Sequence, residues 1–69
     1  MTPTRFRACL ESIGWSQRGL ADRLGVHETR TRRWASGRYE VPQNVADWLQ
    51  CLCDAHDAAR LPEGWPEHR

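Results

Sequence analysis

The stretch QRGLADRLGVHETRTRRWAS, residues 17–36, decides the fold of this chain. Its first part has apolar or small residues at helical spacing and predicts a helix over residues 17–24, with Ser16 as its N-cap. Gly25 is expected to end this helix, because glycine readily adopts the left-handed backbone conformation found after many helices. A second helix is expected over residues 28–35, and two short helices joined by a tight glycine turn form a helix-turn-helix. The residues expected at the contact between the two helices are Leu20, Ala21, Leu24, Val26 and Trp34.

Electrical charge is distributed unevenly along the chain. Residues 1–39 carry eight arginines against three acidic residues, a net charge of +5, and they include the motif. Residues 40–69 carry two arginines against six acidic residues, a net charge of −4, so the overall charge of +1 conceals the asymmetry. The second helix of the motif reads ETRTRR over residues 28–33. This layout is typical of a DNA-binding face with a second face turned away from phosphate.

Helical patterns also flank the motif. Thr2 and Pro3 are expected to start a first helix as its N-cap and first helical residue, and Gly14 to end it. Pro42 is expected to open a last helix that runs to about Ala59. The apolar positions of these two helices are Phe6, Leu10, Ile13, Val45, Trp48, Leu49, Leu52 and Ala59.

Several positions along the chain carry the residue types of one known protein family, in the same order and with the same spacing. These positions are Ser16-Gln17, Leu20-Ala21, Leu24-Gly25-Val26, Trp34, Ser36-Gly37 and Val41-Pro42. With them the chain resembles the helix-turn-helix of the phage lambda repressor and Cro family, also called the XRE family, over roughly residues 6–59. The resemblance implies an all-α, compact domain of four or five helices over residues 1–60, followed by a C-terminal tail over residues 61–69. The sequence departs from the family at Gly19, in a helix interior, and at Thr31, where the family usually has Val or Ile. We therefore expect a more loosely seated recognition helix.

The resemblance also implies which residues touch DNA. Glu28, Thr29 and Arg33 occupy the positions that contact bases in the family, and Arg32 borders them. Arginine can pair with guanine O6 and N7, glutamate can accept from cytosine N4, and threonine can meet a thymine methyl group. Phosphate contacts, which set register without carrying sequence information, are expected from Gln17, His27, Arg30, Ser36 and Arg38.

A domain this small makes few base contacts, so we expect a homodimer on a pseudo-palindromic operator. Its half-sites should lie about one helical turn, roughly 34 Å, apart. Trp48 and Leu52 of the last helix and Trp65 of the tail are the expected dimer contacts, whereas Val45 and Leu49 are expected to close the core.

The predicted function is that of a sequence-specific regulator of transcription that binds double-stranded DNA. Small proteins of the resembling family are often phage or mobile-element repressors or autorepressors, and occlusion of a promoter is the simplest mechanism. Activation through an acidic contact at Glu40 or Asp47 is left open. The alternative from another class is a protein-interaction module, such as an antitoxin that binds a partner protein through its last helix and tail.

Other classes of function find little support in the residues. We expect no enzyme, because the chain has no glycine-rich phosphate loop, nucleophile elbow or paired carboxylates. Cys51, Cys53 and His56 suggest zinc, but structural zinc takes four ligands and these two thiols project from a helix about 200° apart. We therefore expect no metal or cofactor and semi-buried or exposed thiols, with redox sensing through Cys51 or Cys53 left open. Trp15 and Trp34 are expected in the core. The first residues lack the apolar run of a secretion signal and no stretch is long enough for a membrane span, so we expect a cytoplasmic protein.

Overall fold

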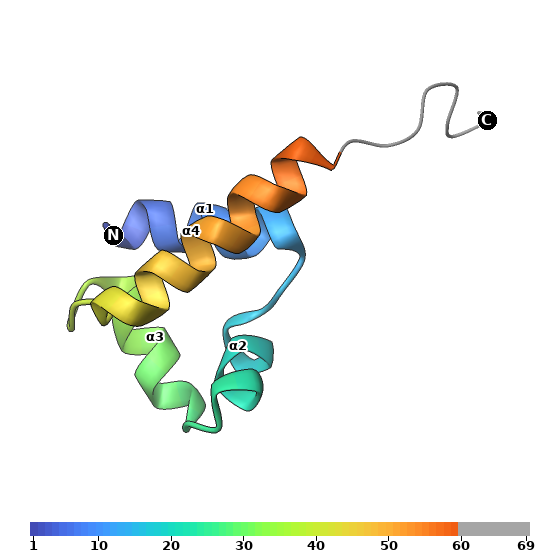
Figure 1. Cartoon of the computed structure of the whole chain (residues 1–69). Helices are drawn as coiled ribbons and strands as arrows, with labels where there is room; N and C mark the ends of the chain where they lie inside the picture. Colours follow the sequence, from blue (N-terminus) through green and yellow to red (C-terminus); the bar gives the residue numbers. More distant parts are fainter. Residues whose placement is uncertain (60–69) are drawn as a thin grey trace, which may run out of the picture.

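The computed structural model describes residues 1–59, which form four α-helices and no strand (Figure 1). The helices are α1 (Pro3–Ile13), α2 (Gln17–Leu24), α3 (Glu28–Ser36) and α4 (Gln43–Ala58). Helices α1 and α4 lie side by side, α1 also contacts α3, and α2 packs against α3. The predicted all-helical fold with four helices is confirmed for this part of the chain. The tail over residues 61–69, with Trp65, lies outside the described residues.

Short polar side chains start the first two helices, as predicted. The hydroxyl oxygen of Thr2 accepts a hydrogen bond from the backbone N–H of Arg5 at 3.0 Å. The hydroxyl oxygen of Ser16 accepts one from the backbone N–H of Gly19 at 2.9 Å. Each cap satisfies an amide that has no partner within its helix, and this explains why the chain becomes helical at these points.

Helix α2 ends where the sequence predicts. Gly25 has φ of 71°, the left-handed conformation that turns the chain sharply towards α3. Helix α1 also ends as predicted, with Gly14 as its C-cap at φ of 76°. Two ends differ slightly from the prediction: α3 extends one residue further, to Ser36, and α4 begins at Gln43, with Pro42 as its N-cap. None of the helices within residues 1–59 is long and apolar enough to cross a membrane.

The hydrophobic core lies between the helices and has an aromatic pair at its centre. The rings of Phe6 and Trp34 meet edge to face, with centroids 6.1 Å apart and an interplanar angle of 89°. Trp34 is buried, as predicted, but Trp15 is only partly buried and packs against the margin of the core. The indole of Trp15 meets that of Trp48 instead, at a centroid distance of 5.7 Å. The core residues are Phe6, Leu10, Leu20, Trp34, Ala35, Val41, Ala46 and Leu49.

Two of the three cysteines lie in the contact between α1 and α4. Cys9 and Cys53 are buried, whereas Cys51 is exposed on the other side of α4. The expectation of a semi-buried or exposed thiol is therefore wrong for Cys53, because the inner side of α4 at this position faces α1. Burial, and next a hydrogen bond with the Cys53 thiol, raises the pKa of Cys9 to about 11. A thiol in such an apolar setting is unreactive at neutral pH.

Candidate nucleic-acid interface

The angle between α2 and α3 is fixed by a buried threonine. Thr31 is fully buried, and the single hydrogen of its hydroxyl is shared between the backbone oxygens of Gln17 and Glu28, each 2.9 Å from Oγ1. The bond to Gln17 ties the middle of α3 to the first turn of α2. The structure therefore corrects the expectation of a loosely seated α3. A hydroxyl can replace a core methyl group here because a carbonyl oxygen lies within reach and satisfies it.

The outer side of α3 is basic. Thr31, Trp34 and Ala35 point into the domain and are buried. Arg30, Arg32, Arg33 and Ser36 are exposed, and Glu28 and Thr29 are half-buried. At about 100° per residue, the four residues expected to touch bases span a continuous sector of roughly 140°, in which Thr29, Arg32 and Arg33 lie opposite the buried side and Glu28 lies at its margin.

A histidine that the sequence suggested only as a phosphate contact also caps α3. The Nδ1 atom of His27 accepts a hydrogen bond from the backbone N–H of Thr29 at 3.1 Å and lies 2.7 Å from the hydroxyl oxygen of Thr29. An Nδ1 atom that accepts this bond leaves Nε2 as the nitrogen that carries hydrogen in the neutral ring. His27 can therefore hold the first turn of α3 and still donate from Nε2 to an anion. Sequence reasoning missed the cap because histidine is not a usual N-cap residue.

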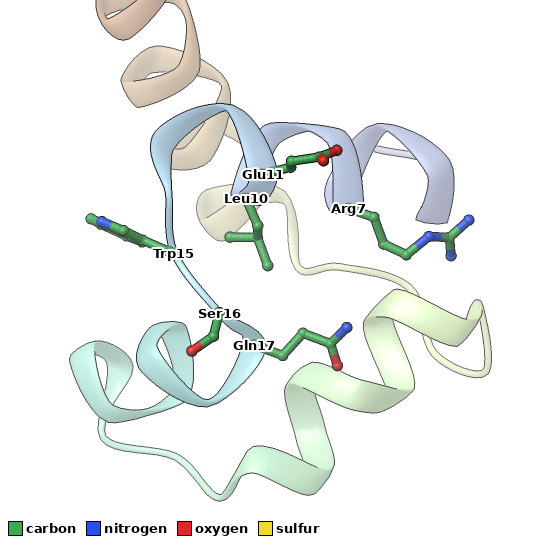
Figure 2. A pocket seen from close by; sticks show the side chains of 6 residues that line it. All are labelled: Arg7, Leu10, Glu11, Trp15, Ser16 and Gln17. Carbon is green, nitrogen blue, oxygen red and sulfur yellow. The ribbon is translucent and has the colours of Figure 1, made fainter.

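Gln17 lies at the edge of a surface hollow of about 360 Å³ between α1 and the start of α2 (Figure 2). Figure 2 shows the side chains of Gln17 and Trp15 on opposite sides of this hollow. Arg7 reaches across from α1 and donates to the backbone oxygen of Ala35 near the end of α3. This bond holds the end of α3 against α1. The full lining of the hollow is Arg7, Leu10, Glu11, Trp15, Ser16 and Gln17.

The remaining phosphate candidates follow the end of α3. The hydroxyl of exposed Ser36 donates to the backbone oxygen of Arg33 at 3.2 Å. Exposed Arg38 is held by its backbone N–H, which donates to the same oxygen at 2.9 Å. The structure thus places both residues beside the basic side of α3.

One residue of this region was missed by the sequence reasoning. Tyr39 is 54% exposed, and the guanidinium carbon of Arg33 lies 5.3 Å from the centre of its ring. The two residues line a hollow of about 280 Å³ together with Arg30, Trp34 and Pro42. The available signal was an aromatic residue within a polar connection directly after the basic helix.

The structure also explains why a glycine fits at position 19, where the sequence departs from the resembling family. A Cβ atom at this position would lie 3.2 Å from both the Nη1 atom of Arg23 and the hydroxyl oxygen of Ser16. Arg23 uses this space: its Nη1 donates to the backbone oxygen of Gly19 at 3.1 Å, and its guanidinium carbon lies 4.0 Å from the centre of the Trp15 ring. The missing side chain thus makes room for an arginine that covers an aromatic ring.

The outward side of α4 differs from that of α3, because it carries aspartates and an apolar stripe in place of arginines. Trp48 is 38% exposed, Leu52 and Val45 are half-buried, and Leu49 is fully buried. Cys51 and Ala55 are exposed next to Trp48 and Leu52 along the helix. We refer to this outward stripe of α4 as the α4 seam; its residues are Trp48, Cys51, Leu52 and Ala55.

Acidic residues flank the α4 seam. Exposed Asp47 and Asp54 accept hydrogen bonds from Gln43 and Gln50 of the same helix, at 2.7 and 2.8 Å. Asp57 accepts one from Ser12 of α1 at 3.1 Å. Within residues 1–59, no group of three or more His, Cys, Asp or Glu side chains is arranged to hold a metal ion.

No protein-family model matches this chain, and the searches of curated proteins and of solved structures found no match either. Its function is therefore inferred from its own residues and their arrangement.

Proposed function

We propose that this protein is a sequence-specific regulator of transcription that binds double-stranded DNA, of the lambda repressor and Cro type. The observation that carries the proposal is the position of Arg30, Arg32 and Arg33, which are exposed on a helix whose other side is buried. An exposed, cationic helix that is held rigidly on a small domain suits the major groove of DNA.

The arrangement of residues on and around α3 supports separate sets of base contacts and phosphate contacts. Glu28, Thr29, Arg32 and Arg33 share the outer sector and are the proposed base contacts. The proposed phosphate contacts surround this sector at the start of α2, at the two ends of α3 and in the connection that follows, and they are Gln17, His27, Arg30, Ser36 and Arg38. The acidic α4 would stay away from the phosphates, since like charges repel.

The proposed mechanism is repression, including autorepression, by occupation of a promoter in the cytoplasm. A single domain offers four base-contacting side chains, so a useful preference for one operator requires two copies on two half-sites. We propose that the second copy packs against the α4 seam. The small side chains of Cys51 and Ala55 let two helices approach closely, while Trp48 and Leu52 supply apolar area.

Oligomeric state tests the dimer separately from DNA binding. Analytical ultracentrifugation should show a dimer of the full chain, either in the free protein or in its complex with DNA. The Trp48→Ala substitution should shift the monomer–dimer equilibrium towards the monomer. Mild oxidation should then join two copies through Cys51, and Cys51→Ser should abolish this product. A chain that stays monomeric both free and on DNA would refute the dimer.

The main experiment measures binding to DNA by fluorescence anisotropy. Duplexes selected from a random pool would be compared with shuffled duplexes at several salt concentrations. The proposal requires tighter binding to the selected duplex and a steep loss of affinity with salt, because each neutralised phosphate releases counterions. Equal and weak binding to both duplexes would refute sequence-specific recognition.

Two arginines provide a matched pair of variants. Arg33→Ala should cost roughly 1–3 kcal/mol at the selected site and relax the preference at one base pair, whereas Arg38→Ala should weaken binding to all duplexes alike. If Arg33→Ala left the preferred sequence unchanged, its assignment to a base would be wrong.

The exposed α4 seam also favours a second candidate function, that of a module that binds another protein. Under this alternative, the full chain would show no sequence-dependent DNA binding, and deletion of residues 61–69 or Trp48→Ala would abolish capture of the partner. If DNA binding is sequence-dependent and survives deletion of the tail, the regulator is favoured.

A further inference from the structure

Tyr39 and Arg33 form a pair whose geometry indicates more than chance proximity. We infer that Tyr39 is a positioning residue for base recognition, whose ring holds the guanidinium of Arg33 in the orientation that reads a base. The inference rests on the proposed function, since it assigns a role within the same interface.

The backbone holds the two residues together. The backbone N–H of Tyr39 donates to the carbonyl oxygen of Arg33 at 3.3 Å, and that of Arg38 donates to the same oxygen at 2.9 Å. Gly37, with φ of 84°, turns the chain back so that these bonds form. The way in which α3 ends therefore brings Arg33 and Tyr39 close enough for their side chains to meet.

The ring constrains Arg33 without using its hydrogen-bond donors. The guanidinium carbon lies 5.3 Å from the ring centre, within the range of a cation–π contact. The donors of a guanidinium lie in its plane, so a guanidinium whose face meets the ring on binding keeps them free for guanine O6 and N7. An arginine whose side chain is already ordered loses less conformational entropy on binding than a free one.

Packing in the hydrophobic core does not explain the position of the Tyr39 side chain. The residue is 54% exposed and is not part of the core cluster. Its surroundings are those of the proposed interface, because Arg30 and Arg33 line the same hollow. Tyr39 thus shares a surface hollow with two of the exposed arginines of α3.

Three variants test the role of the ring in binding. Tyr39→Ala should weaken binding to the selected duplex by roughly 2- to 5-fold, the size of an exposed cation–π contact. It should also broaden the preference at the base pair read by Arg33, while binding to shuffled duplexes and the salt slope stay unchanged. Tyr39→Phe should retain wild-type affinity and preference, because the ring remains. Gln43→Ala, an exposed and uncharged position at the start of α4, serves as the control.

A double-mutant cycle separates positioning from a direct contact. In the Arg33→Ala background, Tyr39→Ala should have no further effect, since the group that it positions is gone. Equal losses in both backgrounds would overturn the inference. A loss in Tyr39→Phe as large as in Tyr39→Ala would also overturn it, because the hydroxyl would then be the active group.

A measurement on the free protein separates the positioning role of Tyr39 from the proposed DNA-binding function. In NMR spectra of the free protein, the Arg33 side-chain protons should be shifted by the Tyr39 ring current, and Tyr39→Ala should remove the shift. Wild-type protein that binds specifically but shows no such shift would refute the positioning role alone. Absence of sequence preference in the wild type would refute both proposals, whether or not the shift is seen.

Discussion

Helices α2 and α3 are joined by a different kind of contact from the one that joins α1 and α4. Between α2 and α3, the Thr31 hydroxyl donates to a backbone oxygen of the neighbouring helix at 2.9 Å. Between α1 and α4, the inner part of the contact is made by buried apolar residues and two thiols, with Phe6 and Leu49 fully buried. Hydrogen bonds from Arg5 to Gln50 and from Ser12 to Asp57 lie at its exposed margin. Apolar burial stabilises a fold but has little direction, whereas a hydrogen bond has both distance and angle. The pair that presents the arginines is thus the pair in which a buried side chain bonds directly to the backbone of the neighbouring helix.

The outward faces of the two pairs also differ in charge. Helix α3 exposes three arginines, and α4 exposes aspartates together with the apolar seam. Under the proposed function, DNA contact belongs to α2 and α3 and self-association to α4, so substitutions in the two pairs should have different consequences.

The largest effect is expected from Leu49→Ala in the α1–α4 pair. Leu49 is fully buried, and removal of such a side chain leaves a cavity that costs about 2–5 kcal/mol of unfolding free energy. That is most of the stability of a domain of this size. Urea unfolding followed by circular dichroism should show a chain that is largely unfolded in buffer. Cys51→Ala, on the exposed side of the same helix, should change the stability by less than about 0.5 kcal/mol.

A smaller effect is expected from Gly25→Ala in the turn of the α2–α3 pair. An added Cβ would meet nothing within 4 Å, so the cost comes from the backbone, whose φ is 71°. A residue with a Cβ pays about 1–2 kcal/mol for this conformation. Thermal unfolding should show the loss, and Gly25→Asn should show less of it. A Gly25→Ala variant as stable as the wild type would mean that the turn has rearranged.

Thr31→Val tests the directional bond itself. The substitution keeps the shape but removes the hydroxyl that bonds Gln17, and we expect a loss of about 1 kcal/mol. Amide hydrogen exchange in α3 should accelerate more than in α4, while Thr31→Ser, which keeps the hydroxyl, should preserve the slow exchange of α3. Equal acceleration in all helices would show that the bond contributes only general stability.

The smallest effect concerns the thiols between α1 and α4. Burial raises the pKa of Cys9 from 9.0 to about 11, so the folded state holds this proton more tightly than the unfolded state. The stabilisation is complete below pH 9 and is lost as the pH rises to about 11. The urea midpoint of the wild type should therefore fall more steeply between these two pH values than that of Cys9→Ala. Parallel pH profiles would contradict the contribution of Cys9.

The helices and their ends could be predicted from the sequence because they depend on neighbours in the chain. Thr2 and Ser16 cap amides three residues away, and Gly25 ends α2 through its own backbone freedom. The outer sector of α3 also follows from the sequence, since helical periodicity fixes which residues lie opposite Trp34.

Contacts between distant residues could not be predicted in this way. The hydroxyl of Thr31 finds its partner 14 residues away, and the sequence suggested only an imperfect core residue. Cys51 and Cys53 are chemically identical, yet only the packing of α1 on α4 decides that one is exposed and the other buried. Trp15 moved from the expected core to its margin because the ring of Trp48 and the guanidinium of Arg23 offer it partners there.

The sequence by itself thus determined four helices, the N-caps of α1 and α2, the segregation of charge and the residues on the exposed side of α3. The tertiary structure decided how α3 is anchored, which thiols are buried and which ring lies beside Arg33. The physical reason is the range of the interactions: caps and periodicity act over one turn of helix, whereas burial and side-chain partnership depend on which helices pack together.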